Sequence, residues 1–187
     1  RVVSGTMAVT MGGAAAMNIH GKNNYALGSF GEGVRSFELM TPSGELVQCS
    51  REQEPELFHA AISGFGMLGC FTKLEIQTKR VNSGRLRVSG IVARDIEHNL
   101  EILEDMCGEA DYLVSWVDLH AKGKSLGRGL MHRADQMKPG EDPQGLRYFD
   151  PSLQDVPPNL FGVVPKGWLW PGMWCAVHMR QVALVNW

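Results

Sequence analysis

Alternating apolar and polar side chains predict an antiparallel hairpin in the first part of the chain. Val34 to Thr41, VRSFELMT, alternates with a period of about two, and Glu45 to Cys49 follows as a second β-prone run. The turn Pro42-Ser43-Gly44 separates the two runs, so they are expected to form an antiparallel hairpin. Cys70 to Lys79 is a third predicted strand, and Ala8 to Met11 is a short fourth.

Two segments of the same region have the pattern of helices. Glu54 to Ser63 has Pro55 in a first-turn position. Its apolar stripe is made of Leu57, Phe58, Ala61 and Ile62. Ala14 to Ile19 is a run of good helix formers, and Gly12-Gly13 directly before it would stand at the N-terminus of that helix.

The character of the chain changes at Val81-Asn82-Ser83-Gly84, which predicts one domain over residues 1–82 and another over residues 83–187. In the second, Arg85 to Arg94 is a predicted strand, and Asp95 is the predicted N-cap of a helix from Ile96 to Met106. The stripe expected to be buried is Ile96, Leu100, Ile102 and Leu103. Further strands are predicted at Asp111 to Leu119 and Gly129 to Arg133, a pattern typical of an α+β domain.

The end of the chain has the composition of irregular structure. Lys138 to Pro158 is rich in proline, glycine and aspartate, which predicts a loop or a flap. Gly167 to Trp174 is densely aromatic, and three interpretations stay open for it: the wall or lid of a substrate site, a surface that faces lipid, and a core segment exposed by truncation. The chain starts at Arg1 in what resembles a loop before a strand, and nothing in Cys175 to Trp187 closes a domain. We therefore expect an internal fragment.

Composition and charge exclude several classes of protein. Of the 187 residues, 44% are hydrophobic and 20% are charged, as in ordinary globular proteins. The net charge is −2 and no basic block is present, which argues against a nucleic-acid partner. No apolar run approaches the roughly 18 residues of a membrane span. There is no signal peptide, so a cytoplasmic location is expected, and the aromatic segment is the one weak argument for membrane association.

Metal chemistry has no supporting motif. The cysteines are widely scattered, which predicts reduced thiols and neither a zinc site nor a disulfide framework; they are Cys49, Cys70, Cys107 and Cys175. The histidines show no HxxxH or HExxH spacing, so no metal site is expected. Asp118 and His120 could share a strand face as a dyad, and the favoured interpretation is a polar strand end.

Met11 to Ser29, MGGAAAMNIHGKNNYALGS, is the strongest candidate for a ligand site. Gly12 and Gly13 would place helix N–H groups where an anion such as a pyrophosphate can bind. His20 would leave the helix beside that ligand. The other interpretation is a tightly packed helix entered through a glycine turn.

Two stretches resemble a known family. GTMAVTMGGAAAMNIHGKNNYALGSFGEGVRSFELMTPSGELVQCS, followed by EPELFHAAISGFGMLGCFTKLEIQT, is similar to the FAD-binding domain of the vanillyl-alcohol oxidase / p-cresol methylhydroxylase superfamily. HGKN and GSFG most resemble the decaprenylphosphoryl-β-D-ribose oxidases and the related sugar and aldonolactone oxidases. The resemblance implies an α+β fold: the second half of a PCMH-type FAD-binding domain, with an antiparallel sheet and flanking helices, followed by the start of an α+β substrate or cap domain.

The resemblance also implies FAD as the cofactor, bound mostly through backbone atoms. The residues that match the cofactor-binding positions are Gly5, Thr10, Met11, Gly12, Gly13, Met17, Asn18, Ile19 and His20, with Cys70 and Phe71 at the adenine. On the substrate side the match falls on His20, Gly21 and Lys22. His20 would be a pocket wall and hydrogen-bond donor, and Lys22 either a substrate anchor or a solvated loop lysine. Asn23 is expected to fix the turn.

The activity that the resemblance implies is that of an FAD-linked oxidase or dehydrogenase. It would oxidise an alcohol carbon of a small sugar or sugar-like substrate by hydride transfer to flavin N5. The catalytic base is expected beyond Trp187, so the chain alone is expected to be inactive. Two alternatives stay open: a non-redox module for another phosphate-bearing ligand, and an interaction fragment that docks through its tryptophan-rich tail. The exact substrate, electron acceptor, mode of FAD attachment and oligomeric state are not decided by the sequence.

Overall fold

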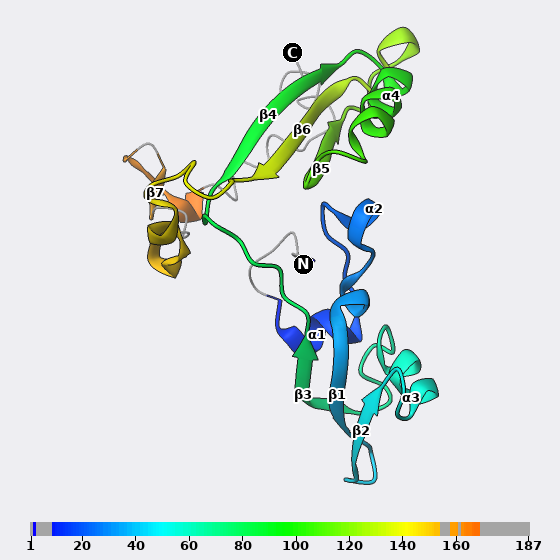
Figure 1. Ribbon diagram of the computed structural model, residues 1–187. Helices are drawn as coiled ribbons and strands as arrows, with labels where there is room; N and C mark the ends of the chain where they lie inside the picture. Colours follow the sequence, from blue (N-terminus) through cyan, green and yellow to red (C-terminus); the bar gives the residue numbers. More distant parts are fainter. Residues whose placement is uncertain (1, 3–8, 154–157, 161, 169–187) are drawn as a thin grey trace. The chain divides into compact units, whose positions relative to one another are not determined.

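The computed structural model describes residues 2, 9–153, 158–160 and 162–168. The chain divides into two compact units, residues 1–80 and 81–187, each with its own antiparallel sheet and hydrophobic core (Figure 1). Helices flank both sheets. The predicted α+β class is therefore confirmed.

A three-stranded sheet forms the centre of the first unit. β1 (Val34–Met40) lies between β2 (Leu46–Ser50) and β3 (Cys70–Ile76), and both neighbours pair with it in the antiparallel sense. The predicted hairpin is confirmed as β1 and β2, joined by the turn at residues 41–45. β3 begins at the predicted residue and ends three residues before the predicted end, where the chain leaves the pairing with β1.

Stacked aromatic rings hold the core of the first unit together. α3 (Pro55–Ala61) is the predicted helix, with Pro55 in its first turn. The ring of Phe58 stacks on Phe37 of β1 with centroids 5.2 Å apart, and Phe71 of β3 meets Phe37 edge-on at 4.9 Å. The stripe predicted for this helix is confirmed, with Phe58 and Ala61 buried and Leu57 and Ile62 packed against the core. Other buried members of the core are Ala14, Ala15, Phe30, Val34, Leu39 and Cys49.

The first helix starts earlier than the sequence predicts. α1 (Met11–Ala16) has Thr10 as its N-cap, and the Thr10 Oγ1 accepts the N–H of Gly13 at 3.1 Å. The strand predicted for Ala8 to Met11 is therefore wrong for residues 9–11, because the threonine cap draws them into a helix start; Ala8 lies outside the described residues. Gly12 and Gly13 do stand in the first turn, as predicted.

The same helix also ends earlier than predicted, because Asn18 adopts a left-handed backbone with φ 44°. The N–H of Asn18 donates to the Ala15 carbonyl at 3.1 Å, and the N–H of Ile19 donates to the Ala14 carbonyl at 3.1 Å. These two bonds form a Schellman motif, which stops the helix. The short helices α2 (Asn24–Leu27) and η1 (Phe30–Gly33) follow before β1.

A buried carboxylate lies in the first sheet. Glu38 of β1 is 8% exposed and accepts hydrogen bonds from Gln48 Nε2 at 2.7 Å, Thr72 Oγ1 at 2.7 Å and Lys73 Nζ at 3.0 Å. A bulge in β3 at Thr72 brings both Thr72 and Lys73 to the carboxylate. The hydrogen bonds from Thr72 and Lys73 lower the pKa of Glu38, although burial acts in the opposite direction.

The second unit is built on a sheet in the order β4 (Leu86–Ala93), β6 (Gly129–Gln136), β5 (Tyr112–Val117), with α4 (Ile96–Met106) packed on one face (Figure 1). All four elements lie where the sequence predicts them, and β6 is longer than predicted because its pairing with β4 continues to Gln136. Asp95 is the predicted N-cap, and its Oδ1 accepts the His98 N–H at 2.8 Å. The buried core consists of Ala93, Ile102, Ala110, Leu113 and Met131.

The buried stripe predicted for α4 is wrong in three of its four members. Ile102 is buried, but Ile96, Leu100 and Leu103 are 37%, 52% and 38% exposed. Asn99 takes their place on the sheet side: its Oδ1 accepts from Ser115 Oγ at 2.9 Å, and its Nδ2 donates to the Gly127 carbonyl at 3.4 Å. These bonds satisfy a buried amide, and the helix face that carries Asn99 and Ile102 is the one that meets the sheet.

Residues 138–153 of the predicted loop segment form a loop in the structure, with two 3₁₀ turns, η3 (Gly145–Phe149) and η4 (Pro151–Leu153). Its first part is anchored to the start of the second unit. Ser83 Oγ donates to Asp142 Oδ2 at 2.8 Å, and the Gly84 N–H donates to the Gly145 carbonyl at 3.1 Å. Residues 154–157 lie outside the described residues.

The remaining described elements are short: η2 (Gly123–Ser125), the paired β7 (Asn159–Leu160) and β8 (Val164–Pro165), and η5 (Lys166–Trp168). Trp168 is 73% exposed, and residues 169–174 of the predicted aromatic segment lie outside the described residues. In the part of the chain that the structure describes, no helix has the length and apolar character needed to cross a membrane.

Replacing Phe58 with alanine should lower the free energy of unfolding by about 3–5 kcal/mol, because it removes a fully buried ring and leaves a cavity beside Phe37. Urea unfolding followed by far-UV circular dichroism measures this change. Met67→Ala, at a residue 78% exposed, is the control and should change stability by less than about 0.5 kcal/mol. Equal losses in both variants would contradict the prediction.

Glu38→Gln should destabilise the chain near neutral pH and make its stability less dependent on acid. Because the folded pKa of Glu38 lies below the ordinary value of 4.5, the ionised carboxylate stabilises the fold above the unfolded pKa, and this contribution is lost as the pH falls through the folded pKa. Denaturant unfolding at about pH 7 and about pH 3 tests this. Glu45→Gln, at an exposed residue of the same hairpin, is the control. A loss for Glu38→Gln that is the same at both pH values would refute the prediction.

Candidate functional site

The first turn of α1 offers backbone N–H groups to a ligand. Thr10 Oγ1 accepts the N–H of Gly13, and the Thr10 carbonyl accepts the N–H of Ala14. Helix geometry leaves the N–H groups of Met11 and Gly12 without an intrahelical acceptor. Gly12 and Gly13 are half-buried and carry no side chain, so a ligand can approach the backbone closely. Because α1 has only six residues, these N–H groups would attract an anion more than the small helix dipole would.

The start of β3 lies beside that turn. A Cβ placed on Gly12 would stand 4.0 Å from the Cβ of Phe71. Gly69 leads into the strand with φ 150°, and a Cβ there would come within 2.3 Å of the Met40 carbonyl oxygen, so only glycine fits. Cys70 is exposed and Phe71 is half-buried. The structure thus brings together two predicted groups that are far apart in sequence, the glycine pair and Cys70–Phe71.

A strained loop runs along the C-terminal end of α1. The N–H of Ser63 donates to the Ala15 carbonyl at 3.1 Å, and the N–H of Phe65 donates to the Ala16 carbonyl at 2.9 Å. Ser63 and Phe65 have φ values of 71° and 55°, in the left-handed region that is costly for residues other than glycine. Large apolar side chains are exposed here, namely Met17 (52%), Phe65 (65%) and Met67 (78%). Such side chains can contact a flat ring system.

The predicted substrate-side residues follow the C-terminal end of α1. His20 and Lys22 are exposed, and Gly21 is half-buried. Asn23 is buried, and its carbonyl accepts the N–H groups of Ala26 and Leu27, so it fixes the turn into α2 as predicted. A helix of six residues is about 9 Å long. The glycine pair and His20 therefore stand at opposite ends of α1.

The contacts of Asn18 and Ile19 were not predicted. The Oδ1 of Asn18 accepts the N–H of Gly31 at 2.8 Å, and the carbonyl of Ile19 accepts the N–H of Phe30 at 2.8 Å. The Asn18 side chain is thus engaged within the protein. An asparagine just after a short run of helix formers is a known signal for a left-handed helix end, and it could have located this turn. Gly5, another predicted cofactor residue, lies outside the described residues.

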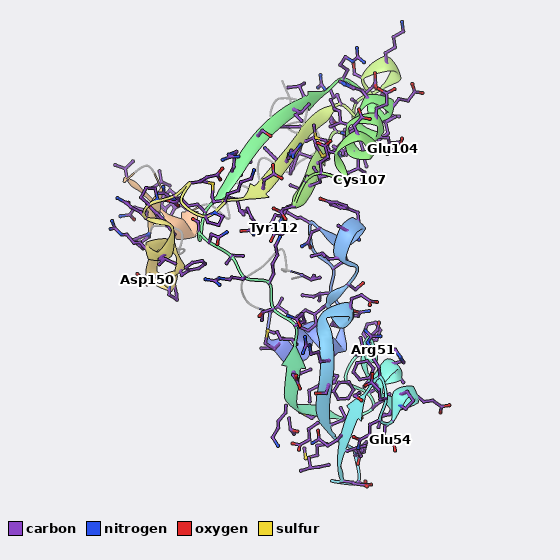
Figure 2. All side chains as sticks on the ribbon, in the orientation of Figure 1. Arg51, Glu54, Glu104, Cys107, Tyr112 and Asp150 are labelled. Carbon is purple, nitrogen blue, oxygen red and sulfur yellow. The ribbon has the colours of Figure 1, made fainter. Side chains whose placement is uncertain are left out.

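A pocket of ≈ 400 Å³ in the first unit is lined by none of the residues predicted to bind cofactor or substrate. It is lined by Glu32, Gly33, Val34, Arg35, Arg51, Glu52 and Gln77. Arg51, labelled in Figure 2, lies 3.6 Å from Glu32 and 5.6 Å from the centroid of the Phe58 ring. Arg35 donates to the side chain of Gln77. Both arginines are thus occupied by groups of the protein, which favours a structural role for this pocket.

Asp118 and His120 do not form a catalytic dyad. Asp118 Oδ1 accepts the backbone N–H groups of His120 at 3.0 Å and Ala121 at 3.1 Å, and its Oδ2 accepts from Arg128 Nε at 3.2 Å. Burial raises the pKa of Asp118, but these hydrogen bonds together hold it below its ordinary value. The carboxylate closes the turn after β5, in agreement with the predicted polar strand end. Among the described residues, no cluster of three or more His, Cys, Asp or Glu side chains could hold a metal ion.

Comparison with known proteins shows similarity to flavin enzymes. Residues 3–50 match the model of an FAD binding domain. The chain is 32% identical over 184 residues to decaprenylphosphoryl-beta-D-ribose oxidase of Mycolicibacterium smegmatis, covering 90% of the chain and 40% of that protein. It is 34% identical over 93 residues to cytokinin dehydrogenase 6 of Oryza sativa subsp. japonica, covering 46% of the chain and 18% of that protein. It is 37% identical over 67 residues to mitochondrial L-galactono-1,4-lactone dehydrogenase of Arabidopsis thaliana, covering 36% of the chain and 11% of that protein.

The residues of the first unit fit FAD, the cofactor of the matched domain. The chain spans less than half the length of each of these relatives. The part that matches the FAD-binding domain contains α1 and the hairpin. Backbone N–H groups at a half-buried glycine pair suit the phosphates of FAD, and the exposed apolar side chains suit its rings. The cofactor is therefore FAD, and the first unit contains part of an FAD-binding domain that is similar to those of the PCMH-type flavin enzymes of the vanillyl-alcohol oxidase / p-cresol methylhydroxylase superfamily.

Proposed function

We propose that the whole protein is an FAD-dependent oxidoreductase that oxidises an alcohol carbon of a sugar or sugar-like small molecule. Bound FAD supplies the hydride acceptor, its N5 atom. The observation that carries the proposal is the first turn of α1, where a half-buried glycine pair within the matched FAD-binding region lies beside the start of β3. Two of the similar proteins are named for a ribose and a galactonolactone, which supports a sugar-like substrate.

In this proposal the two ends of α1 have different tasks. The N–H groups of Met11 and Gly12 bind the pyrophosphate, and the backbone at Cys70 and Phe71 lies against the adenine. Thr10, Gly13, Met17 and Ile19 complete the cofactor side through backbone atoms. His20 and Lys22 face the substrate, with His20 as a hydrogen-bond donor and Lys22 as an anchor for a hydroxyl-rich or anionic group. The exposure of both side chains supports this assignment.

We further infer that residues 1–82 are the C-terminal part of the PCMH-type domain and that residues 83–187 begin the substrate domain. The boundary between the two compact units, at Arg80 and Val81, supports this division. In the second sheet, the face opposite α4 exposes Val88, Val92 and Trp116. An apolar face of this kind can cover a small molecule and exclude water from it.

Purification of the whole protein tests the proposed function. The protein should be yellow, with the visible absorbance of oxidised flavin, and anaerobic addition of a substrate from a panel of sugars and aldonolactones should bleach it. A colourless protein that takes up no FAD would contradict the proposed function. A flavoprotein that no member of the panel reduces would contradict the substrate class.

Gly12→Asp should weaken FAD binding at least about tenfold, and Gly12→Asn should weaken it less than about threefold. The nearest atom to a Cβ at this position is Phe71 Cβ at 4.0 Å, an ordinary contact, so the two similar side chains differ mainly in charge. A carboxylate in the first turn would repel the pyrophosphate, and a tenfold change corresponds to roughly 1.4 kcal/mol. Fluorescence titration of the apoprotein with FAD measures both affinities. Equal affinities would show that the phosphates bind elsewhere.

A further inference from the structure

We propose that Asn18 is a positioning residue: its side chain holds the loop that carries His20, Gly21 and Lys22 in the place where they meet cofactor and substrate. The inference rests on the proposed function for the role of that loop. The hydrogen bonds that carry it are independent of any ligand.

The backbone of Asn18 is the first part of the argument. With φ 44° it occupies the left-handed position after α1, and its N–H and that of Ile19 close the helix by bonds to Ala15 and Ala14. Glycine and asparagine are the residues that adopt this conformation most readily. The left-handed conformation at position 18 therefore suits glycine as well as asparagine, so it does not explain why an asparagine side chain is present.

The side chain of Asn18 makes a contact that glycine cannot make. Its Oδ1 accepts the N–H of Gly31 at 2.8 Å, across thirteen residues of sequence. Gly31 is buried, so without this acceptor its N–H would have no water to compensate for the lost bond. A Cβ on Gly31 would come within 2.9 Å of the Asn18 Oδ1 and 2.7 Å of Ile62 Cγ2. The close approach of the amide therefore requires glycine at position 31.

A second hydrogen bond completes the base of the loop. The carbonyl of Ile19 accepts the N–H of Phe30 at 2.8 Å, and Ile19 itself packs against the core of the first unit. Adjacent residues thus join the two ends of the segment from Ile19 to Phe30. His20 and Lys22 are exposed within this closed segment, so their positions depend on the bonds at its base.

Three substitutions at position 18 of the full-length protein separate the left-handed backbone conformation from the hydrogen bond of the side chain. Asn18→Gly keeps the left-handed turn and removes the acceptor, Asn18→Asp keeps the acceptor, and Asn18→Ala loses the acceptor and strains the turn. Amide hydrogen exchange in peptides that contain Gly31 should be at least about tenfold faster in Asn18→Gly and close to the unsubstituted rate in Asn18→Asp. These measurements use the apoprotein and need no cofactor.

FAD binding by the same variants tests the positioning role. Asn18→Gly should bind FAD at least about tenfold more weakly and should change the visible circular dichroism of the bound flavin. In Asn18→Asp, the FAD affinity and the flavin spectrum should stay close to those of the unsubstituted protein. A residue that only stabilises the fold would change the melting temperature of the apoprotein and leave the spectrum of bound flavin unchanged. Asn18→Ala, which also disturbs the helix end, should show the largest loss of stability.

The outcomes separate this inference from the proposed function. Absence of FAD binding by the unsubstituted protein would contradict the proposed function. Unchanged hydrogen exchange in Asn18→Gly would overturn the inference, because the Asn18 side chain would then not protect the Gly31 N–H or fix the loop. Faster exchange with unchanged FAD affinity and an unchanged flavin spectrum would also overturn it, while the proposed function would stand.

Discussion

The contact of the Phe37 ring with Phe58 and Phe71 is the constraint on which the first unit depends. Phe37 lies in the central strand, so the helix α3 and the strand β3 are both placed by the rings that they pack against it. Phe71 also borders Gly12 at the first turn of α1. The spacing between the helix start and the strand start is therefore a result of core packing. Ala14 and Ala15, almost fully buried, are small enough to let α1 lie this close to the sheet.

The shortness of α1 is the second property that shapes the candidate site. A threonine cap starts the helix, and an asparagine in the left-handed conformation stops it after six residues. Both ends of a helix carry backbone groups that the helix itself cannot satisfy. In α1 the C-terminal carbonyls of Ala15 and Ala16 accept N–H groups from the loop at Ser63 and Phe65, whereas the N–H groups of Met11 and Gly12 in the first turn have no acceptor within the helix. The two ends are thus chemically different although they are close in space.

Elements with strong local signals could be predicted from the sequence, and those decided by distant residues could not. The hairpin, the proline-started helix α3 and the Asp95 cap of α4 follow from patterns within a few residues. The stripe of α4 was wrong because Asn99 finds its partners in Ser115 and Gly127, which no local periodicity reveals. In the site, the glycine pair was identified from its place before a run of helix formers, whereas Cys70 and Phe71 were identified through family resemblance. Nothing in these two separate sequences indicates that they meet. The contact between Asn18 and Gly31 depends on how the chain returns to α1, so spacing could not disclose it.

The donors around Glu38 have a consequence for how the first sheet is assembled. Gln48 comes from β2, and Thr72 and Lys73 come from β3, so one carboxylate is bonded to both neighbouring strands. Sliding either strand by one residue would turn its side chains to the opposite face and take the donors away from a buried charge. Misaligned pairings during folding are thereby penalised by an uncompensated carboxylate in addition to lost apolar contact. Glu38, in the central strand, thus favours the native alignment of both neighbouring strands.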